Sequence, residues 1–504
     1  MRSKQAMKNM IANVFLQIVI FTSGIILPRF FMEAYGSGVN GMITSVNQFL
    51  AYLGLAEAGV GTASVVALYS PLACDDKEEV NSILSATRKF YNRSGVLFLV
   101  LVLVLAFFYP ILISRQLDSG MVRGMVLVLA SSTLVDYFFL GKYRVLLTAN
   151  QEGYVVAIIQ SIGTVVNIIV SILLIYHHTP VILVKAVATG VYMLRLILVR
   201  IYVRKRYPHL NFKAAPKPEA LPQRGAALLH QVVGVIVNNT DVVLLTILIG
   251  QNSLLEVSVY GVYNLVATAV NMFMTSFTNG LTAGFGEVIS KGEDETLEKS
   301  YASYEYVYMI VLAIVVICMG ALILPFVSIY TKNMSDVSYV RPVVGFLFTV
   351  IVFLQNLRIP GLTIICAAGH YKETRYQAIA EAVINIVVSI LLIGKLGISG
   401  VLIGTICSYG YRSFDVILYN SKYLVRNSRK KTMSRFLRNF VLIILLMMLS
   451  WSLVPQNLTS FIMWFIYAII LGLLSTVLFG IVNYIAEPNE CKDLYMRIKR
   501  VIWH

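Results

Sequence analysis

The sequence predicts an all-α, polytopic membrane protein with fourteen transmembrane helices. We expect two pseudo-symmetric six-helix bundles around a central cavity, plus two C-terminal helices. Three observations lead to this fold class: the apolar composition, the spacing of apolar stretches and an internal repeat. Of the 504 residues, 58% are hydrophobic and only 13% are charged, whereas a soluble domain is about half apolar and a quarter charged. This composition indicates lipid as the solvent.

Stretches of roughly 20 mostly apolar residues, the length that crosses a bilayer core, recur along the whole chain. We place the fourteen spans at about 10–32, 40–69, 91–114, 121–141, 154–176, 181–203, 226–250, 256–289, 304–330, 339–367, 374–394, 397–420, 436–454 and 460–484. The connectors between them are too short for a soluble domain. The first stretch is too long for a signal-peptide core and lacks a small-x-small cleavage site, so we expect it to be retained.

The formal net charge of +16 is explained by membrane topology. If the N-terminus is cytoplasmic and the chain alternates sides, most Lys and Arg residues fall in inward-facing segments. Only five lie in outward-facing segments: Arg115, Arg123, Lys332, Arg341 and Lys395. This distribution follows the positive-inside rule. We therefore expect a cytoplasmic (cell) membrane protein with both termini in the cytoplasm, in contact with anionic membrane lipids and with no nucleic-acid partner.

An apolar phrase occurs twice in the chain. Residues 167–175 read NIIVSILLI and residues 385–393 read NIVVSILLI, which match at eight of nine positions, 218 residues apart. At the same offset, Val122 and Arg123 correspond to Val340 and Arg341. The first twelve spans therefore form two copies of a six-span unit. Because six is even, both copies enter the membrane from the same side, and two such bundles can rock about a shared midplane cavity, as transporters do.

The predicted organisation follows from this repeat and from two polar, basic connectors. The segments are an N-terminal six-helix bundle (1–203), a cytoplasmic linker (204–224), a C-terminal six-helix bundle (225–421), a basic linker (422–435), two additional transmembrane helices (436–484) and a cytoplasmic tail (485–504).

Charged residues inside the spans are the candidate functional residues, because each costs about 2.5–3.5 kcal/mol at a helix centre. The candidate substrate-binding residues are Arg29, Arg195, Arg358 and Arg412. The candidate coupling or cavity acids are Glu57, Asp136, Asp241 and Glu381. A guanidinium group suits a phosphate, since its donor fork grips two oxygen atoms and it stays charged. The alternative is that the acids and arginines form interhelical ion pairs that stabilise the bundles.

The sequence predicts neither a metal site nor a cofactor. The five cysteines form no CxxC motif, and the only histidine cluster, His177–His178, has side chains that point to different faces. A nucleotide-binding loop is also absent from the sequence. We therefore expect a transporter, not an enzyme, driven by an ion gradient, the membrane potential or consumption of its product.

Several stretches resemble one family of transporters. They are LPRFFMEAYGSGVNGMITSVNQF (27–49), NNTDVVLLTIL (238–248), VSVYGVYN (257–264), LRIPGLTIICAAGHYKETRYQAIAEAVINIVVSILLI (357–393) and GISGVLIGT (397–405). These resemble the polysaccharide-transport branch of the multidrug/oligosaccharidyl-lipid/polysaccharide exporter superfamily, which includes Wzx-type O-antigen and capsule flippases. The likeness runs over essentially the whole chain. It implies two six-helix bundles that form a V around a cavity, commonly with two extra helices.

The resemblance also implies a function. The usual cargo of this branch is an undecaprenyl-diphosphate-linked oligosaccharide, flipped from the inner to the outer leaflet, and cavity arginines are implied to hold its diphosphate. Arg29, Arg358 and Arg412 stand in places compatible with that role, while Arg195 and Asp241 rest on the charge argument alone. We therefore expect a flippase for surface polysaccharide biosynthesis, with polysaccharide assembly proteins as further partners. Two alternatives are a cation or drug antiporter on the same scaffold and a membrane-embedded glycan polymerase.

Overall fold

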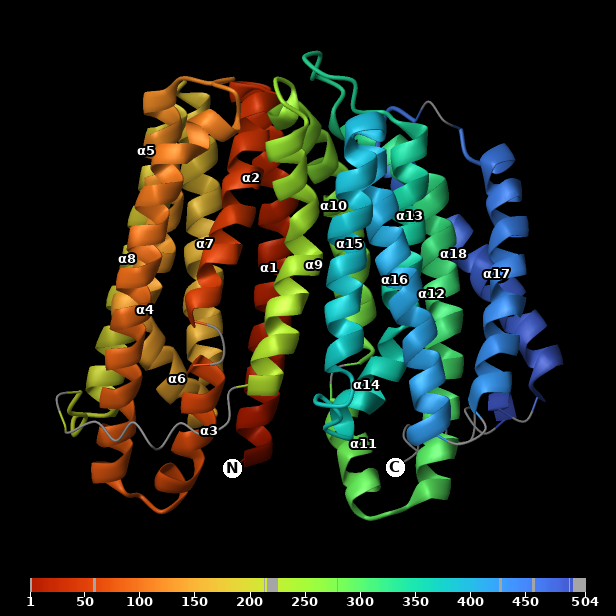
Figure 1. Ribbon diagram of the computed structural model, residues 1–504, viewed down its shortest axis with the longest axis horizontal. Coiled ribbons are helices and arrows are strands. Elements are labelled where there is room, and N and C mark those ends of the chain that lie inside the picture. The colour runs from red at the N-terminus through yellow and green to blue at the C-terminus, as the bar shows by residue number, and fades with distance from the viewer. Residues whose placement is uncertain are drawn as a thin grey trace. The chain divides into compact units, whose positions relative to one another are not determined.

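The computed structural model describes residues 2–57, 60–212, 214, 225–278, 280–425, 428–455, 458–488 and 490–492, and these form helices without a strand. Contacts divide the chain into an N-terminal unit (1–258) and a C-terminal unit (259–504). Figure 1 shows the helices of each unit. The all-α prediction is confirmed. Most of the predicted linker 204–224, part of the linker 422–435 and most of the tail 485–504 lie outside the described residues.

The N-terminal unit spans the whole predicted first bundle, 1–203, and the first helix of the second. Its elements are α1 (Arg2–Tyr35), α2 (Ser37–Leu53), the 3₁₀ segment η1 (Gly54–Glu57), α3 (Val60–Ala73), α4 (Lys77–Leu112), α5 (Ser119–Val135), the π-helical segment η2 (Asp136–Leu140), α6 (Gly141–Ala149), α7 (Gly153–Tyr176), α8 (Val181–Arg206) and α9 (Gly225–Leu248). The next helix, α10 (Ser253–Ser276), begins in this unit.

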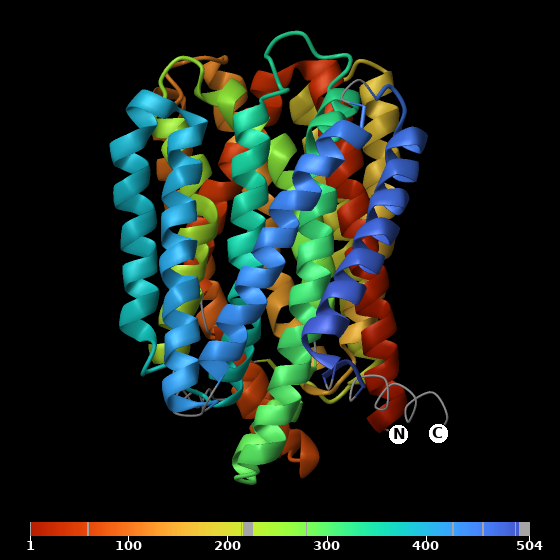
Figure 2. The same ribbon diagram turned by 90° about the vertical axis from the view of Figure 1, so that its right-hand side faces the viewer.

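The remaining helices belong to the C-terminal unit. They are α11 (Leu281–Ser290), α12 (Asp294–Tyr330), α13 (Pro342–Leu357), α14 (Ile359–Ala367), α15 (Arg375–Leu396), α16 (Ile398–Tyr423), α17 (Ser428–Leu453) and α18 (Phe461–Ala486). The two C-terminal helices, α17 and α18, pack along α12, as Figure 2 shows.

Helix α9 packs against α2 through buried hydroxyl groups. The Ser45 and Thr246 hydroxyls lie 2.7 Å apart, and the Tyr52 hydroxyl lies 2.5 Å from that of Thr240. Such hydrogen bonds between small polar side chains hold helices together where lipid provides no hydrophobic driving force. The first helix that the sequence assigns to the second repeat is therefore tied to the N-terminal unit.

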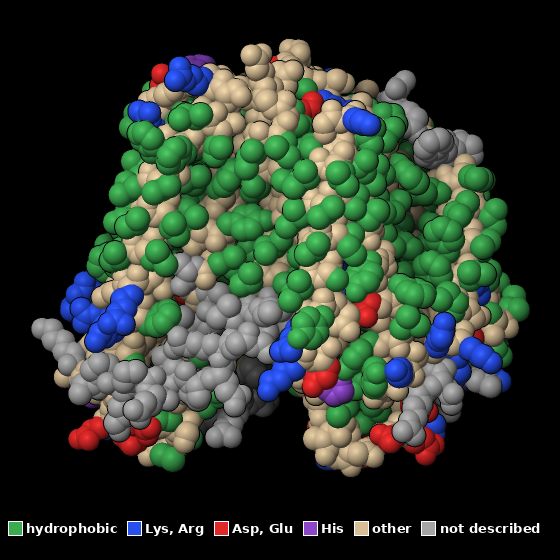
Figure 3. Space-filling view, viewed as in Figure 1, with side chains coloured by type: hydrophobic (Ala, Val, Ile, Leu, Met, Phe, Trp, Pro, Cys, Tyr) green, Lys and Arg blue, Asp and Glu red, His purple; other side chains and the backbone are tan. Residues whose placement is uncertain are grey.

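Twelve helices of the described residues are long and apolar enough to span a membrane. The predicted count of fourteen is not confirmed, for two physical reasons. The span predicted at 40–69 is broken at η1 into two short helices, α2 and α3. Helix α16 has a sufficient length of 26 residues but carries too many polar side chains. Even so, the chain is a multi-pass membrane protein: in Figure 3, apolar side chains cover the middle of each unit, and charged side chains lie mostly toward its ends.

The doubled phrase packs differently in the two repeats. In the second, α15 lies so close to α16 that a Cβ atom at Gly404 would be 2.1 Å from the Ser389 hydroxyl and 2.8 Å from its backbone nitrogen. The corresponding helix of the first repeat, α8, also has 26 residues. Its seventh residue is Val187, whereas the seventh residue of α16 is Gly404. Close approach therefore depends on glycine in α16, as is common for membrane helices.

This packing yields a test on one helix. We expect Gly404→Ala to lower the free energy of unfolding by about 1–3 kcal/mol, because its Cβ overlaps Ser389. Gly410→Ala is the matched control, since a Cβ there meets no atom within 4 Å and helix propensity improves. The midpoint of thermal unfolding in detergent micelles measures both. Equal midpoints for the two variants would contradict the close packing.

Candidate functional site

A cluster of charged side chains lies inside the C-terminal unit, where a helix is interrupted. Arg358 separates α13 from α14, and Pro360 follows as one of the first residues of α14. Proline has no backbone N–H and cannot continue the hydrogen-bond ladder of α13. Gly361 then lets α14 approach α16, because a Cβ there would lie 2.4 Å from Val416 Cγ1. The break therefore places the Arg358 side chain against α15 and α16.

Two arginines of this cluster share one carboxylate. Arg358 Nη1 donates a hydrogen bond to Glu381 Oε1, and Arg412 Nε lies 3.7 Å from Glu381 Oε2. The second carboxylate, Asp415, accepts a hydrogen bond of 2.6 Å from Arg412 Nη1. The Arg358 guanidinium also lies 4.2 Å from the centre of the Tyr409 ring. The side chains of Arg358, Glu381 and Arg412 are 11%, 7% and 3% exposed.

The interhelical ion-pair interpretation is thus confirmed for Arg358, Arg412 and Glu381. Two carboxylates balance two guanidinium groups, so this cluster carries no net charge. The pairing also brings two guanidinium groups together: Arg358 and Arg412 each contact one oxygen atom of the Glu381 carboxylate.

A second cluster lies in the N-terminal unit and has the opposite arrangement. Arg144 on α6 lies between two acids, with Nη1 2.7 Å from Asp136 Oδ2 and Nη2 3.4 Å from Glu57 Oε1. Glu57 ends η1, and Asp136 begins the π-helical segment η2. Both acids therefore stand at irregular turns, which reorient side chains within a span. Glu57 and Asp136 were predicted candidates, whereas Arg144 was not, because it lies beyond the predicted end of its span.

A cavity of about 420 Å³ adjoins this second cluster. Glu57, Tyr91 and Arg144 line its polar side. The other lining residues are Gly54, Gly61, Thr62, Val65, Val66, Tyr69, Val145, Thr148 and Gln231. The cavity therefore combines two tyrosine rings with the ion pair of Glu57 and Arg144, and Asp136 contacts Arg144 without lining the cavity.

Of the other predicted site residues, Arg29 and Asp241 lie apart from these clusters, whereas Arg195 lies near Asp136 and Arg144 of the second cluster. Arg29 donates a hydrogen bond of 3.3 Å to Glu33 on its own helix, and both are about one-third exposed. Arg195 on α8 donates to the side-chain oxygen of Gln160 at 3.0 Å. Asp241 is buried on α9 beside Thr240. A substrate-binding or coupling role for any predicted residue stays a prediction.

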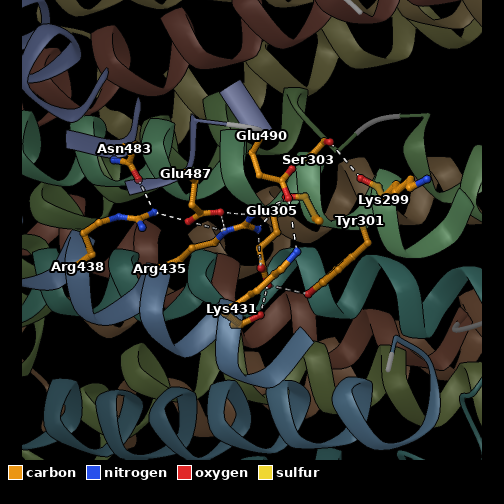
Figure 4. A network of polar contacts seen from close by, with 12 residues as sticks. Lys299, Tyr301, Ser303, Glu305, Lys431, Arg435, Arg438, Asn483, Glu487 and Glu490 are labelled. Carbon is orange, nitrogen blue, oxygen red and sulfur yellow. Dashed lines mark hydrogen bonds and ion pairs between the residues drawn. The ribbon is translucent and has the colours of Figure 1, made fainter. Parts of the chain in front are cut away.

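A third polar network joins the C-terminal helices to α12 (Figure 4). Its centre is Arg435 on α17, which is 1% exposed and contacts Glu305 at 3.1 Å and Glu487 at 2.6 Å. Arg438 donates to Glu487 at 2.7 Å. Sequence reasoning missed Arg435, because it stands in a run of basic residues at a helix end, where the positive-inside rule already explains it.

Known proteins resemble this chain in fold. Neither family models nor curated proteins match the chain. An inward-facing multidrug resistance MATE family transporter of the MOP superfamily has a TM-score of 0.62 at 14% identity, covering 84% of this chain and 98% of that one. The chain has a MATE-like fold. An outward-facing transporter of that family has a TM-score of 0.51 at 14% identity over 84% and 96% of the chains. The Vibrio cholerae MATE transporter VcmN has a TM-score of 0.55 at 14% identity over 84% and 96%. The fold is therefore that of membrane transporters.

The network around Arg435 predicts the effect of removing its charge. We expect Arg435→Met to lower the free energy of unfolding by about 3–5 kcal/mol, because Glu305 and Glu487 would lose their shared partner. Arg429→Met, an exposed position one turn and a half earlier on α17, is the matched control. Thermal unfolding of the full chain in detergent compares the two. A small, equal effect of both substitutions would show that the network contributes little.

The same network predicts a pH dependence. Burial raises the pKa of the Glu487 carboxyl, but hydrogen bonds from Arg435 and Arg438 outweigh burial and hold that pKa below its usual value of 4.5. A carboxyl with a lowered folded-state pKa stabilises the protein above its unfolded-state pKa, and this stabilisation is lost as the pH falls through the folded-state pKa. We therefore expect the temperature of the unfolding midpoint to decrease as the pH is lowered below 4.5. In Glu487→Gln this decrease should be less steep, which thermal unfolding in detergent at a series of pH values measures.

Proposed function

We propose that this protein is a flippase that moves a polyprenyl-diphosphate-linked oligosaccharide across the cytoplasmic membrane by alternating access, for surface polysaccharide biosynthesis. The resemblance of stretches such as 27–49 and 357–393 to polysaccharide flippases supports this cargo, and the MATE-like fold supports transport. The single observation that carries the proposal is the pair Arg358 and Arg412 around the Glu381 carboxylate.

A carboxylate between two guanidinium groups is a chemical stand-in for one phosphate group of the cargo. Each presents anionic oxygen atoms at the spacing that an arginine fork grips. A diphosphate carries more negative charge than the carboxylate and has more acceptor oxygens, so it can replace Glu381 as the partner of both arginines. Glu381 and Asp415 then have a defined role: they neutralise the arginines when no cargo is bound, so that two bare charges are not left inside the bundle.

The depth of Glu381 and Arg412 in the bundle supports a head group that enters from the cytoplasmic leaflet. Glu381 lies six residues into α15, about 9 Å from the start of that helix at a rise of about 1.5 Å per residue. Arg412 lies eleven residues before the end of α16, which is about 16 Å. Both helix ends are on the side that the positive-inside rule assigns to the cytoplasm.

The decisive experiment measures surface-polysaccharide assembly in cells that depend on this protein. We expect Arg358→Ala and Arg412→Ala to reduce assembly at least tenfold at equal protein level, because each removes a phosphate donor. The matched control is Arg375→Ala, an arginine of α15 whose guanidinium lies on Tyr376. The double variant Arg358→Met/Glu381→Met keeps the charges balanced, so a loss of assembly there is not a consequence of an uncompensated charge. Intact assembly in that double variant would overturn the proposal.

One observation favours a cation or drug antiporter as a second candidate. The cavity of the N-terminal unit is lined by the Glu57 carboxylate and two tyrosine rings, a chemistry that binds organic cations. The Arg144 guanidinium that also lines it is paired with Asp136 as well as with Glu57. In this alternative, proteoliposomes with a proton gradient accumulate a fluorescent cationic dye, and Glu57→Gln abolishes accumulation while the exposed control Glu78→Gln does not. A wild-type protein that moves no dye contradicts the antiporter.

A further inference from the structure

Three basic side chains from three helices lie close together in the N-terminal unit. They are Arg88 of α4, Lys142 of α6 and Arg200 of α8, which we call the basic triad. Arg88 and Lys142 are half-buried, and Arg200 is exposed. The charges of both arginines act on the Lys142 ammonium, and no acid of the described residues acts on it. In that part of the chain, none of the three forms an ion pair with a carboxylate. The triad therefore concentrates positive charge that the protein itself does not offset.

Uncharged groups hold the triad in place. The Lys142 ammonium lies 5.1 Å from the centre of the Phe212 ring and 5.2 Å from that of the Tyr143 ring. These two rings pack edge to face, with their centres 5.4 Å apart. Arg88 Nη1 donates a hydrogen bond of 3.4 Å to the Phe212 carbonyl oxygen. A ring face attracts a cation and a carbonyl accepts a hydrogen bond, but neither carries a net charge. The positive charge of the triad thus remains available to a ligand.

The segment that supplies Phe212 is fastened to α4. The Ser85 hydroxyl donates to the Phe212 carbonyl oxygen at 3.1 Å, and the Asn211 backbone N–H donates to the Asn81 side-chain oxygen at 2.9 Å. The chain after α8 therefore folds back against α4, and these bonds keep the Phe212 ring beside Lys142. The triad is a preformed arrangement of three helices and one ordered segment, unlike a run of basic residues at a helix end.

The triad opens toward lipid at headgroup depth. Ile197 and Ile201, on either side of Arg200 in α8, are 51% and 58% exposed. Figure 3 shows Lys and Arg side chains toward the lower end of α8, below apolar side chains. Arg200 lies six residues before the end of α8 and Lys142 seven residues before the end of α6, which is about 9 Å and about 10 Å. Both ends are on the side that the positive-inside rule assigns to the cytoplasm.

The chemistry of the triad and of its surroundings defines the ligand. Arginine forks and a lysine ammonium together bind the oxygen atoms of a phosphate. A ligand that reaches Arg200 between Ile197 and Ile201 also has a hydrocarbon part, because a free anion makes no use of these two side chains. Basic pockets between membrane helices on the cytoplasmic side are a recurring kind of site for anionic lipid headgroups. A phospholipid with a net negative charge combines both parts.

We propose that Arg88, Lys142 and Arg200 form a binding site for the phosphate headgroup of an anionic phospholipid, whose acyl chains lie along α8. This site is separate from the cluster of Arg358 and Arg412, and it does not depend on the identity of the cargo. Without the lipid, three like charges repel one another across α4, α6 and α8. With the lipid, the same charges share one anion and tie the three helices together. The lipid is therefore part of the folded N-terminal unit.

The test compares one substitution with and without the lipid. The full chain is unfolded by heat in dodecyl maltoside micelles, alone or with phosphatidylglycerol, zwitterionic phosphatidylcholine or inorganic phosphate. Without additive, we expect Lys142→Gln to raise the unfolding midpoint above that of wild type, because it relieves the repulsion. Phosphatidylglycerol should raise the wild-type midpoint, and this rise should be at least halved in Lys142→Gln. Phosphatidylcholine and inorganic phosphate should each produce less than half of the wild-type rise.

Two further variants make the result specific. Arg200→Gln changes an exposed position, so it tests the same site without altering a packed side chain, and we expect it also to halve the rise with phosphatidylglycerol. Lys205→Gln, an exposed basic residue at the end of α8, is the matched control for nonspecific attraction to the lipid and should keep the full rise.

Three results would overturn the inference. An equal rise with phosphatidylglycerol in wild type, Lys142→Gln and Arg200→Gln would show that the triad does not bind the lipid. A midpoint that Lys142→Gln lowers equally with and without phosphatidylglycerol would assign Lys142 a structural role only. A rise with inorganic phosphate as large as that with phosphatidylglycerol would identify a free anion as the ligand. Each of these results leaves the proposed function standing, because that proposal depends on Arg358 and Arg412 and is tested by polysaccharide assembly.

Discussion

A charge inside a membrane-spanning bundle needs a partner within the protein, and the partners on neighbouring helices organise the polar interior of both units. Arg358 contacts Glu381 of α15, and Arg144 contacts Glu57 of η1 as well as Asp136 of its own span. Arg435 joins α17 to α12 and to the end of α18. Because lipid offers no alternative partner, each such contact specifies which helices are neighbours as much as it stabilises them.

The interruptions of the helices place these charges. Arg358 stands at the break before Pro360, Glu57 ends a 3₁₀ segment, and Asp136 begins a π-helical one. A straight α-helix would direct these side chains along its regular faces, whereas each irregular turn rotates one side chain toward the bundle interior. The same breaks explain why a helix predicted as one span is found as two shorter helices. The interruptions of the helices and the buried charged side chains therefore occur at the same places in this chain.

The duplicated sequence supports two different interiors. The phrase shared by 167–175 and 385–393 lies in helices that pack at different distances, since Gly404 of α16 has Val187 as its counterpart in α8. Arg195 and Arg412, each the fifteenth residue of its helix, likewise differ in their partners: Arg195 donates to the Gln160 amide oxygen, whereas Arg412 contacts two carboxylates. The two copies of the phrase therefore lie in helices with different polar partners.

The membrane class, the helical fold, the doubled apolar phrase and the candidate charges all follow from the sequence, because local composition determines which segments are long and apolar enough to lie in lipid. Glu381 and Arg358 could be named as candidates in this way, but not as partners, since 23 residues and a helix break separate them. Arg144 and Arg435 were missed because their charges looked like topology signals near helix ends. Only the tertiary structure decides which charges meet, because an ion pair depends on a few ångströms between helices that no local pattern encodes.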